Sequence, residues 1–136
     1  MKDRTMDLHQ TLQQAINEKR RILPGDVGKA LISQYGMKIP SGKRVTHPDE
    51  LRAAARKLGY PLVVQAMAPD LIHKTDQGAV KLGIEKYPAL RKATEGLWTL
   101  FPGAPLLVEK MASPGVEMIV GLTHDDHFGP SLMMGL

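Results

Sequence analysis

Cysteine is absent from the sequence, and aromatic residues are scarce, at 4% of the chain. The lack of thiols excludes disulfide bonds, thiolate metal sites and a thiol nucleophile. With so few aromatic rings, any core has to be built mainly from aliphatic side chains and methionine. No apolar run has the length or the flanking residues of a signal peptide or a membrane span. The sequence therefore predicts a cytoplasmic protein with no membrane segment.

The residues that are present suit one globular domain. The chain has 136 residues, 43% of them hydrophobic, which fits one compact domain and leaves little room for two. Lysine and arginine number 18 against 14 acidic residues, a net charge of +4 with no long basic run. Such an excess suits nucleotides as well as nucleic acid. The low aromatic content and the lack of a basic stripe make a nucleic-acid binder the weaker interpretation.

Hydrophobic periodicity predicts two helices, then alternating strands and helices, then a strand-rich end. The helical spacing and its stop signals indicate helices over residues 8–23, 26–35, 48–58 and 87–100. Short apolar runs indicate strands that end at Val45 or cover residues 61–64, 79–83, 106–108, 116–122 and 131–136. The polar segment 68–78 is expected to be a loop. This order predicts an α/β fold with a mixed sheet flanked by helices.

Two helix starts and the end of the chain carry specific signals. Asp26 suits the N-cap of the second helix, and Pro48 suits the first position of the third. At the other end, residues 133–136 stop in the middle of an apolar run. This ending indicates truncation, and the alternative is an edge strand that ends the protein.

Four stretches, taken in order, resemble one known family. They are Tyr35–Pro40, Gly59–Gln65, His73–Val80 and Phe128–Leu136. Their order and spacing are similar to the ATP-grasp portion of the NDP-forming acyl-CoA synthetases, which include the ADP-forming acetate-CoA ligases. The resemblance implies an N-terminal helix over residues 1–23 and a partial ATP-grasp domain over 24–136, truncated at its C-terminus.

The same resemblance implies a cofactor set. ATP or ADP is the expected nucleotide. In the family, the Gly-Leu ending continues into a glycine pair and an acidic segment whose carboxylates help to hold magnesium and phosphate. Mg²⁺ is therefore expected in the complete domain, with its ligands absent from this chain.

The segment from Val108 to Met111 resembles the hinge strand of ATP-grasp enzymes. Such a strand offers backbone groups to the adenine edge. The resemblance places Glu109 and Met111 beside the base, with Lys110 nearby. Glu117 follows at the spacing of a ribose-binding carboxylate, which accepts hydrogen bonds from both hydroxyls. From spacing alone, the alternative is an ordinary strand with a surface Glu-Lys pair and a solvent-facing Glu117.

Gln65 departs from the family pattern. Relatives usually carry a lysine at this position, at the end of a buried strand and pointing at the ATP phosphates. Glutamine keeps a hydrogen-bond donor but loses the point charge. Either a neighbouring cation such as Lys74 or Lys81 compensates, or nucleotide binding is weak. The alternative is that Gln65 simply ends a strand.

The loop before Val80 holds the residues that the resemblance links to catalysis. His73 matches a histidine that receives a phosphoryl group, and a neutral imidazole is a competent nucleophile near neutral pH. Asp76 is the candidate to orient it, with Asp70 also close in sequence. Lys74 is expected to steady phosphate charge, and Gly78 to let the backbone approach phosphate. Without the family, a His-Lys-Thr-Asp loop is most often a solvated turn.

Residues 124–127, His-Asp-Asp-His, contain metal-ligand types but are not expected to bind a metal. Adjacent residues on a hairpin turn diverge, whereas a metal site needs convergent ligands. We therefore predict no metal site within this chain.

Three functional hypotheses follow. The leading one is the nucleotide-binding portion of an acyl-CoA synthetase, with His73 relaying a phosphoryl group and a CoA-binding domain or subunit as partner. The second is a non-catalytic remnant or interaction module without effective nucleotide binding. The third is the nucleic-acid binder. An exposed apolar C-terminal strand also predicts possible homo-oligomer formation.

Overall fold

A four-stranded antiparallel sheet forms the centre of the protein. The computed structural model describes residues 7–19, 23–68 and 77–136. The sheet has the order β1-β4-β2-β3, and each described strand pair is antiparallel. Its strands are β1 (Gly42–Val45), β4 (Leu106–Lys110), β2 (Leu62–Ala66) and β3 (Val80–Ile84). The predicted α/β class is thus confirmed, but antiparallel pairing replaces the expected mixed sheet.

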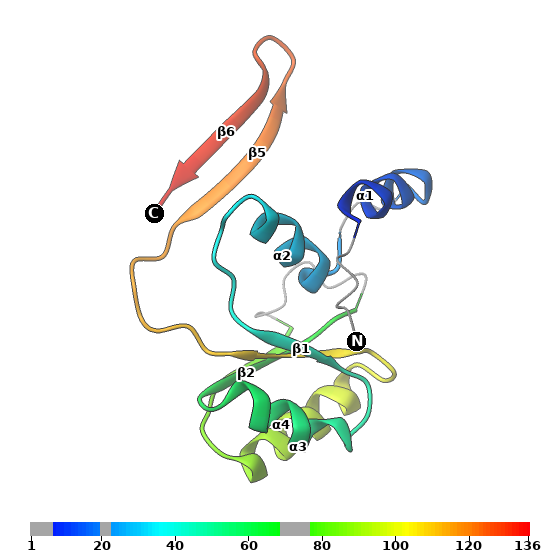
Figure 1. Cartoon of the computed structure of the whole chain (residues 1–136), viewed down its shortest axis with the longest axis vertical. Coiled ribbons are helices and arrows are strands. Elements are labelled where there is room, and N and C mark those ends of the chain that lie inside the picture. The colour runs from blue at the N-terminus through cyan, green and yellow to red at the C-terminus, as the bar shows by residue number, and fades with distance from the viewer. Residues whose placement is uncertain (1–6, 20–22, 69–76) are drawn as a thin grey trace.

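Two helices cover one face of this sheet and enclose the core (Figure 1). They are α3 (Glu50–Leu58) and α4 (Tyr87–Leu100), and α4 has the predicted bounds. The apolar side of each helix packs against every second residue of the strands, because strand side chains alternate between faces. The core residues are Val45, Leu51, Ala54, Ala55, Leu62, Val64, Ala66, Ala79, Ile84, Leu90, Leu97, Leu106 and Val108. The sheet and these two helices form the packed core of the protein, and this core fixes the positions of the strand ends.

The third helix begins two residues later than predicted. Pro48 and Asp49 form a turn, and α3 starts at Glu50. The Glu50 carboxylate accepts hydrogen bonds from the backbone N–H groups of Thr46 (2.7 Å) and His47 (3.2 Å). These bonds fix the loop that enters the helix, which is why Pro48 lies outside the first turn.

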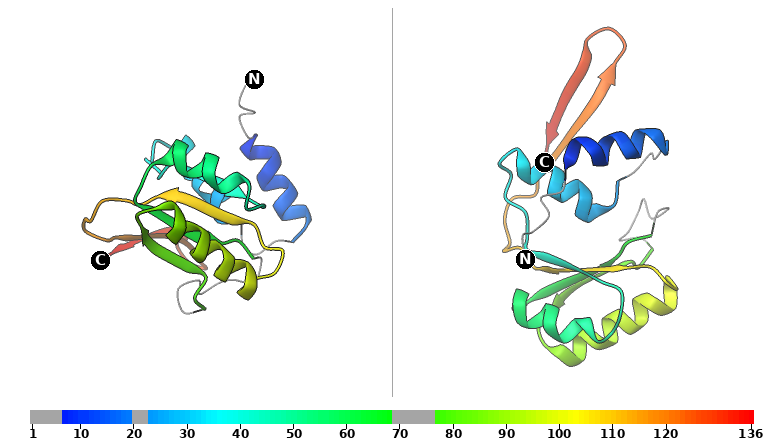
Figure 2. Two further views of the ribbon diagram at one scale, coloured as in Figure 1. Left: turned by 90° about the horizontal axis from the view of Figure 1, so that it is seen from below. Right: turned by 45° about the vertical axis from the view of Figure 1, so that its right-hand side comes forward.

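Helices α1 (Leu8–Asn17) and α2 (Gly25–Gln34) lie beyond the opposite face of the sheet (Figure 2). The first helix ends at Asn17, before the predicted residues 22–23, and Lys19 has a φ of 51° that cannot continue a helix. Residues 20–22 lie outside the described residues. Pro24, not Asp26, is the N-cap of α2, and Asp26 lies in the first turn. No residue of α2 is buried.

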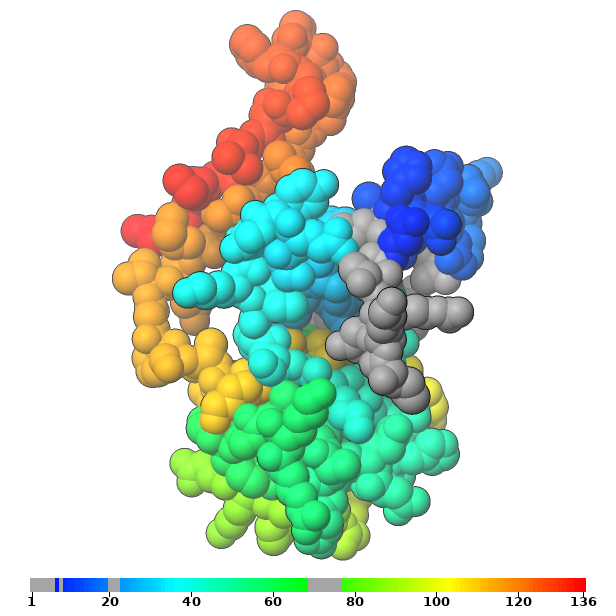
Figure 3. All heavy atoms as spheres, in the orientation of Figure 1, coloured from blue at the N-terminus to red at the C-terminus, as the bar shows by residue number. Residues whose placement is uncertain are grey.

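The C-terminal strands form a separate hairpin. Strands β5 (Ile119–Asp125) and β6 (Gly129–Gly135) pair with each other and, among the described strands, with no other. They project away from the four-stranded sheet (Figures 1 and 3). The first strand begins three residues later than the predicted residue 116. Large apolar side chains on both strands are more than half exposed, among them Leu122, Leu132 and Met134. The hairpin therefore has little cover within the described part of the chain.

Candidate functional site

The sheet face that points away from α3 and α4 carries polar side chains. Along β2, Leu62, Val64 and Ala66 are buried against the helices, so Gln65 points to the opposite face. Glu109 of β4 lies opposite Val63, and directly paired residues share a face of the sheet. The two predicted residues Gln65 and Glu109 therefore meet on the side where α2 lies.

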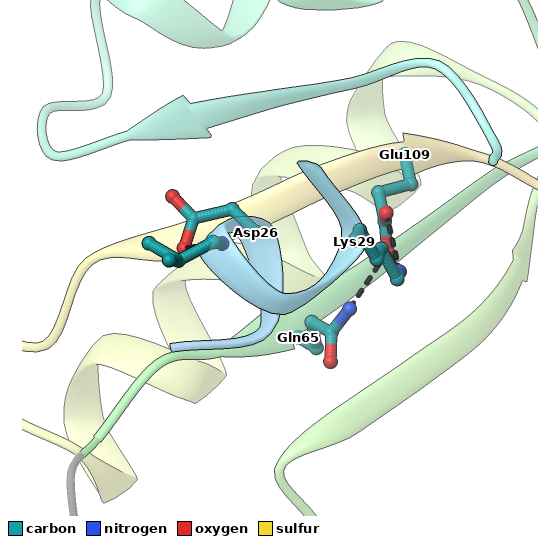
Figure 4. A network of polar contacts seen from close by, with 5 residues as sticks. Asp26, Lys29, Gln65 and Glu109 are labelled. Carbon is teal, nitrogen blue, oxygen red and sulfur yellow. Dashed lines mark hydrogen bonds and ion pairs between the residues drawn. The ribbon is translucent and has the colours of Figure 1, made fainter. Parts of the chain in front are cut away.

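These two side chains and Lys29 of α2 form one bonded group, here called the Glu109 cluster (Figure 4). The Gln65 carboxamide donates to Glu109 Oε2 at 2.7 Å. Lys29 Nζ lies 2.5 Å from Oε1 and 2.6 Å from Oε2 of the same carboxylate. The Glu109 side chain is only 6% exposed, whereas that of Lys29 is 31% exposed. A buried carboxylate is stable when it is paired and hydrogen-bonded in this way.

Lys29 was not among the residues that the sequence predicted. Its partner is 80 positions away in the chain, and α2 offers no local motif that links it to β4. The one available signal is its spacing three residues after Asp26, which puts both on one side of the helix. Asp26 also pairs with the sheet, since Arg44 Nε of β1 lies 3.2 Å from Asp26 Oδ2. Two ion pairs thus join α2 to the sheet.

A glycine makes room for the Glu109 side chain. Gly42 of β1 lies directly opposite Glu109. A Cβ atom added to Gly42 would lie 2.9 Å from Glu109 Cγ and 3.4 Å from Oε1. The edge strand therefore approaches the carboxylate more closely than any residue with a side chain allows.

Lys110 points to the other face of the sheet, and the backbone N–H groups of Lys110 and Met111 are bonded within the fold. Lys110 Nζ donates to the carbonyl oxygen of Tyr60, and Lys110 lies opposite the buried Leu62, so its side chain is on the helix-covered face. The backbone N–H groups of Lys110 and Met111 donate to Ser41 O (2.8 Å) and Pro61 O (3.0 Å). These donors are engaged within the fold, so a base at this hinge has to use other backbone groups.

Glu117 lies in the irregular connection between β4 and β5, and its side chain is exposed. Among the described residues, no hydrogen bond or ion pair joins Glu117 to the Glu109 cluster. The structure therefore does not bring the predicted ribose ligand together with Gln65 and Glu109.

The loop that carries the predicted catalytic residues starts and ends beside Gln65. Gln65 pairs with Val80 of β3, and the Ala66 N–H donates to the Ala79 carbonyl at 2.9 Å. Gly78 has a φ of 67°, a conformation that favours glycine, with open space where a Cβ would be. His73, Lys74 and Asp76, with Asp70, lie outside the described residues.

Lys81, the other expected compensating cation, is not on the cluster's face. It pairs with Val64, which is buried against the helices. Lys29 instead supplies the cation found in the Glu109 cluster.

The turn over residues 124–127 is organised by hydrogen bonds. Asp125 Oδ1 accepts from the backbone N–H groups of His127 (2.8 Å) and Phe128 (3.0 Å). These two bonds hold the pKa of Asp125 below its ordinary value. Within residues 7–19, 23–68 and 77–136, no three histidine or acidic side chains gather as a metal site. Across those same ranges, no helix is both long and apolar enough to traverse a bilayer.

The fold and the sequence together define the class of protein. The sequence profile of the ATP-grasp domain matches residues 14–136. The chain therefore belongs to the ATP-grasp family, a class of nucleotide-binding domains. Its homologues include the β subunits of ADP-forming acetate-CoA ligases, as the resemblance predicted.

Two curated relatives illustrate the match. The chain is 30% identical over 141 residues to the β subunit of acetate-CoA ligase [ADP-forming] I from Pyrococcus furiosus, covering 98% of this chain and 60% of that subunit. It is 33% identical over 118 residues to acetate-CoA ligase [ADP-forming] I from Archaeoglobus fulgidus, covering 82% of this chain and 17% of that protein. The chain thus spans 60% of the first relative and 17% of the second, less than two thirds of either.

Solved structures agree with the sequence match. The dinucleotide-forming acetyl-coenzyme A synthetase 1 of Ca. Korarchaeum cryptofilum, in complex with coenzyme A and Ca-AMPCP, superposes with a TM-score of 0.84 at 32% identity, covering 93% of this chain and 58% of that one. A second structure of that enzyme holds Mg-AMPPCP, with its phosphohistidine segment pointing towards the nucleotide binding site. It gives a TM-score of 0.78 at 31% identity, covering 96% of this chain and 57% of that one.

Proposed function

We propose that this chain is the ADP- and ATP-binding portion of an NDP-forming acyl-CoA synthetase, with the nucleotide held on the sheet face that carries the Glu109 cluster. The observation that carries the proposal is the meeting of Gln65 and Glu109, which the family resemblance assigns to the phosphate side and the adenine side of one nucleotide. They come from neighbouring strands and are joined by a 2.7 Å hydrogen bond. Residues assigned to one ligand therefore share one location.

The proposal includes a phosphoryl relay through His73. An imidazole nitrogen of His73 attacks the phosphorus of a phosphorylated group held by the partner domain, so that a P–N bond forms as the donor's bond to phosphorus breaks and the donor leaves with that electron pair. A terminal phosphate oxygen of ADP then attacks the same phosphorus, giving ATP as the P–N bond breaks and the imidazole is released. Support comes from the loop ends: the chain leaves β2 and enters β3 beside Gln65. In the Korarchaeum enzyme, a phosphohistidine segment points towards the nucleotide binding site. Asp76 is the proposed orienting carboxylate and Lys74 the proposed phosphate contact.

Magnesium does not fit the described residues. The carboxylate at the cluster, Glu109, is already bonded to Lys29 and Gln65, and Mg²⁺ needs free oxygen ligands. The proposal assigns the Mg²⁺-binding carboxylates to other residues of the complete ATP-grasp domain.

A CoA-binding domain or subunit is the proposed partner. Residues that select the acyl group and hold coenzyme A are assigned to that partner, because the chain corresponds to only 17% of the single-chain Archaeoglobus ligase. The isolated chain is accordingly expected to bind nucleotide weakly and to show no ligase turnover.

Calorimetry with ADP and ATP at millimolar concentration tests this function. Wild type is expected to bind weakly, and Gln65→Lys to bind about tenfold more tightly, since a charged contact to phosphate contributes ~1.5–3 kcal/mol. Gln10→Lys, which adds the same charge on the exposed surface of α1, is the matched control and is expected to bind as wild type does. Absence of nucleotide binding in wild type and in Gln65→Lys would instead support the non-catalytic remnant.

A further inference from the structure

The charge of the Glu109 cluster points to a role for α2. Gln65 is neutral and Glu109 is an acceptor carboxylate, so without Lys29 the cluster would present a buried negative group. An unpaired carboxylate repels an anionic ligand and is itself poorly solvated. Lys29 supplies the positive charge, and it comes from a helix that the family resemblance did not connect with the nucleotide.

Lys29 Nζ is placed to contact a ligand as well as to neutralise the Glu109 carboxylate. Lys29 Nζ and Gln65 Nε2 contact the same oxygen, Glu109 Oε2, at 2.6 and 2.7 Å. The two nitrogen atoms are therefore no further apart than the sum of these distances. An ammonium group has three N–H donors, and the Lys29 side chain is 31% exposed while Glu109 is 6% exposed. A phosphate oxygen that reaches the Gln65 amide can thus also reach the ammonium.

We propose that Lys29 is the phosphate-contacting cation of this chain, positioned by Glu109 and acting where Gln65 lacks a charge. The inference rests on the proposed function, because it names the residue that recognises the polyphosphate of the same nucleotide. Lys29 keeps its bond to Glu109 and donates a further N–H to a phosphate oxygen. Lys29 recognises the negative charge of the phosphates, and residues other than Lys29 recognise the base and the ribose.

A purely structural role for Lys29 makes a different prediction. The Arg44–Asp26 ion pair also joins α2 to this face of the sheet, through a residue one helical turn earlier. If Lys29 acted only by holding α2, loss of either ion pair would weaken all ligands alike. Asp26→Asn is therefore the matched control, because it removes the other ion pair without touching the cluster.

The test compares ADP with adenosine, which lacks phosphates, by calorimetry in EDTA so that metal makes no contribution. Glu109→Gln is the reference background, since the glutamine carbonyl oxygen still accepts a hydrogen bond from Lys29 and so keeps it in place, and no buried unpaired carboxylate remains when Lys29 is then replaced. Adding Lys29→Met to this background is expected to weaken ADP about tenfold or more. Adenosine affinity is expected to change less than about twofold, and Asp26→Asn is expected to keep the preference for ADP.

Moving the positive charge from position 29 to position 65 should restore the preference for ADP. Lys29→Met with Gln65→Lys, in the otherwise wild-type chain, is expected to recover the preference for ADP over adenosine, because position 65 then supplies the cation beside Glu109 Oε2. The proposal is overturned if Lys29→Met in the Glu109→Gln background leaves that preference intact, or if it weakens adenosine and ADP equally. Failure of the proposed function is a separate result, in which wild type binds neither adenosine nor ADP.

Discussion

At the scale of single residues, Gly42 determines whether the Glu109 carboxylate can occupy its place. We predict that Gly42→Ala lowers the free energy of unfolding by about 1–3 kcal/mol, the usual effect of overpacking, because the new Cβ would lie 2.9 Å from Glu109 Cγ. Urea denaturation measures this loss. Gly96→Ala, in the interior of α4 with open space around it, is the control and is expected to raise stability by about 0.5–1 kcal/mol. Equal stability of Gly42→Ala and wild type would contradict the close approach.

Single residues also show how much of the site the sequence could predict. Gln65 and Glu109 were identified because each lies within a local motif. Lys29 was missed because its ion pair joins elements 80 residues apart, and no local pattern records a long-range contact. The hinge expectation was incomplete for a related reason: strand pairing, which sets the partners of the Lys110 and Met111 N–H groups, is a property of the sheet.

At the scale of elements, the start of α3 depends on an ionised carboxylate. Backbone hydrogen bonds from Thr46 and His47 hold the pKa of Glu50 below its ordinary value. A lowered folded-state pKa means that the stabilisation is present above the ordinary pKa and is lost as pH falls through the folded-state value. We therefore predict that stability decreases on acidification from about pH 6 to about pH 3, and that Glu50→Gln reduces this decrease.

Chemical denaturation at a series of pH values measures the Glu50 contribution. Glu85→Gln, at an exposed position before α4, is the matched control and is expected to follow wild type. An acid loss of the same size in Glu50→Gln and wild type would show that the carboxylate does not support this helix start.

The sequence predicted the helix bounds correctly where the hydrophobic periodicity is long, as in α4, and less well at helix starts such as that of α2. The α4 bounds follow from fourteen residues of regular spacing with proline in the first turn. Asp26 was mistaken for an N-cap because it is a favoured cap residue, whereas in the fold its carboxylate pairs with Arg44 of β1. Strand pairing direction could not be read from the sequence, since a strand carries the same alternation in either direction.

At the scale of the whole molecule, the four-stranded sheet and helix α2 meet at the Glu109 cluster. The four-stranded sheet packs with α3 and α4 on one face (Figure 1). On its other face, α2 is joined to the sheet by the Lys29–Glu109 ion pair (Figure 4) and by the Arg44–Asp26 ion pair. The hairpin of β5 and β6 projects with its apolar side chains exposed. Self-association through this hairpin stays a prediction, as does the division of the chain at residue 23.

The central claim is that nucleotide binds on the α2 side of the sheet. The most direct test is a titration of ¹⁵N-labelled chain with ADP, followed by backbone amide chemical shifts. We predict progressive shifts at Gln65, Gly78 and Glu109, with the amides of Arg52 and Tyr87 on the helix-covered side unchanged. An absence of shifts at millimolar ADP, or shifts centred on α3 and α4, would contradict the account.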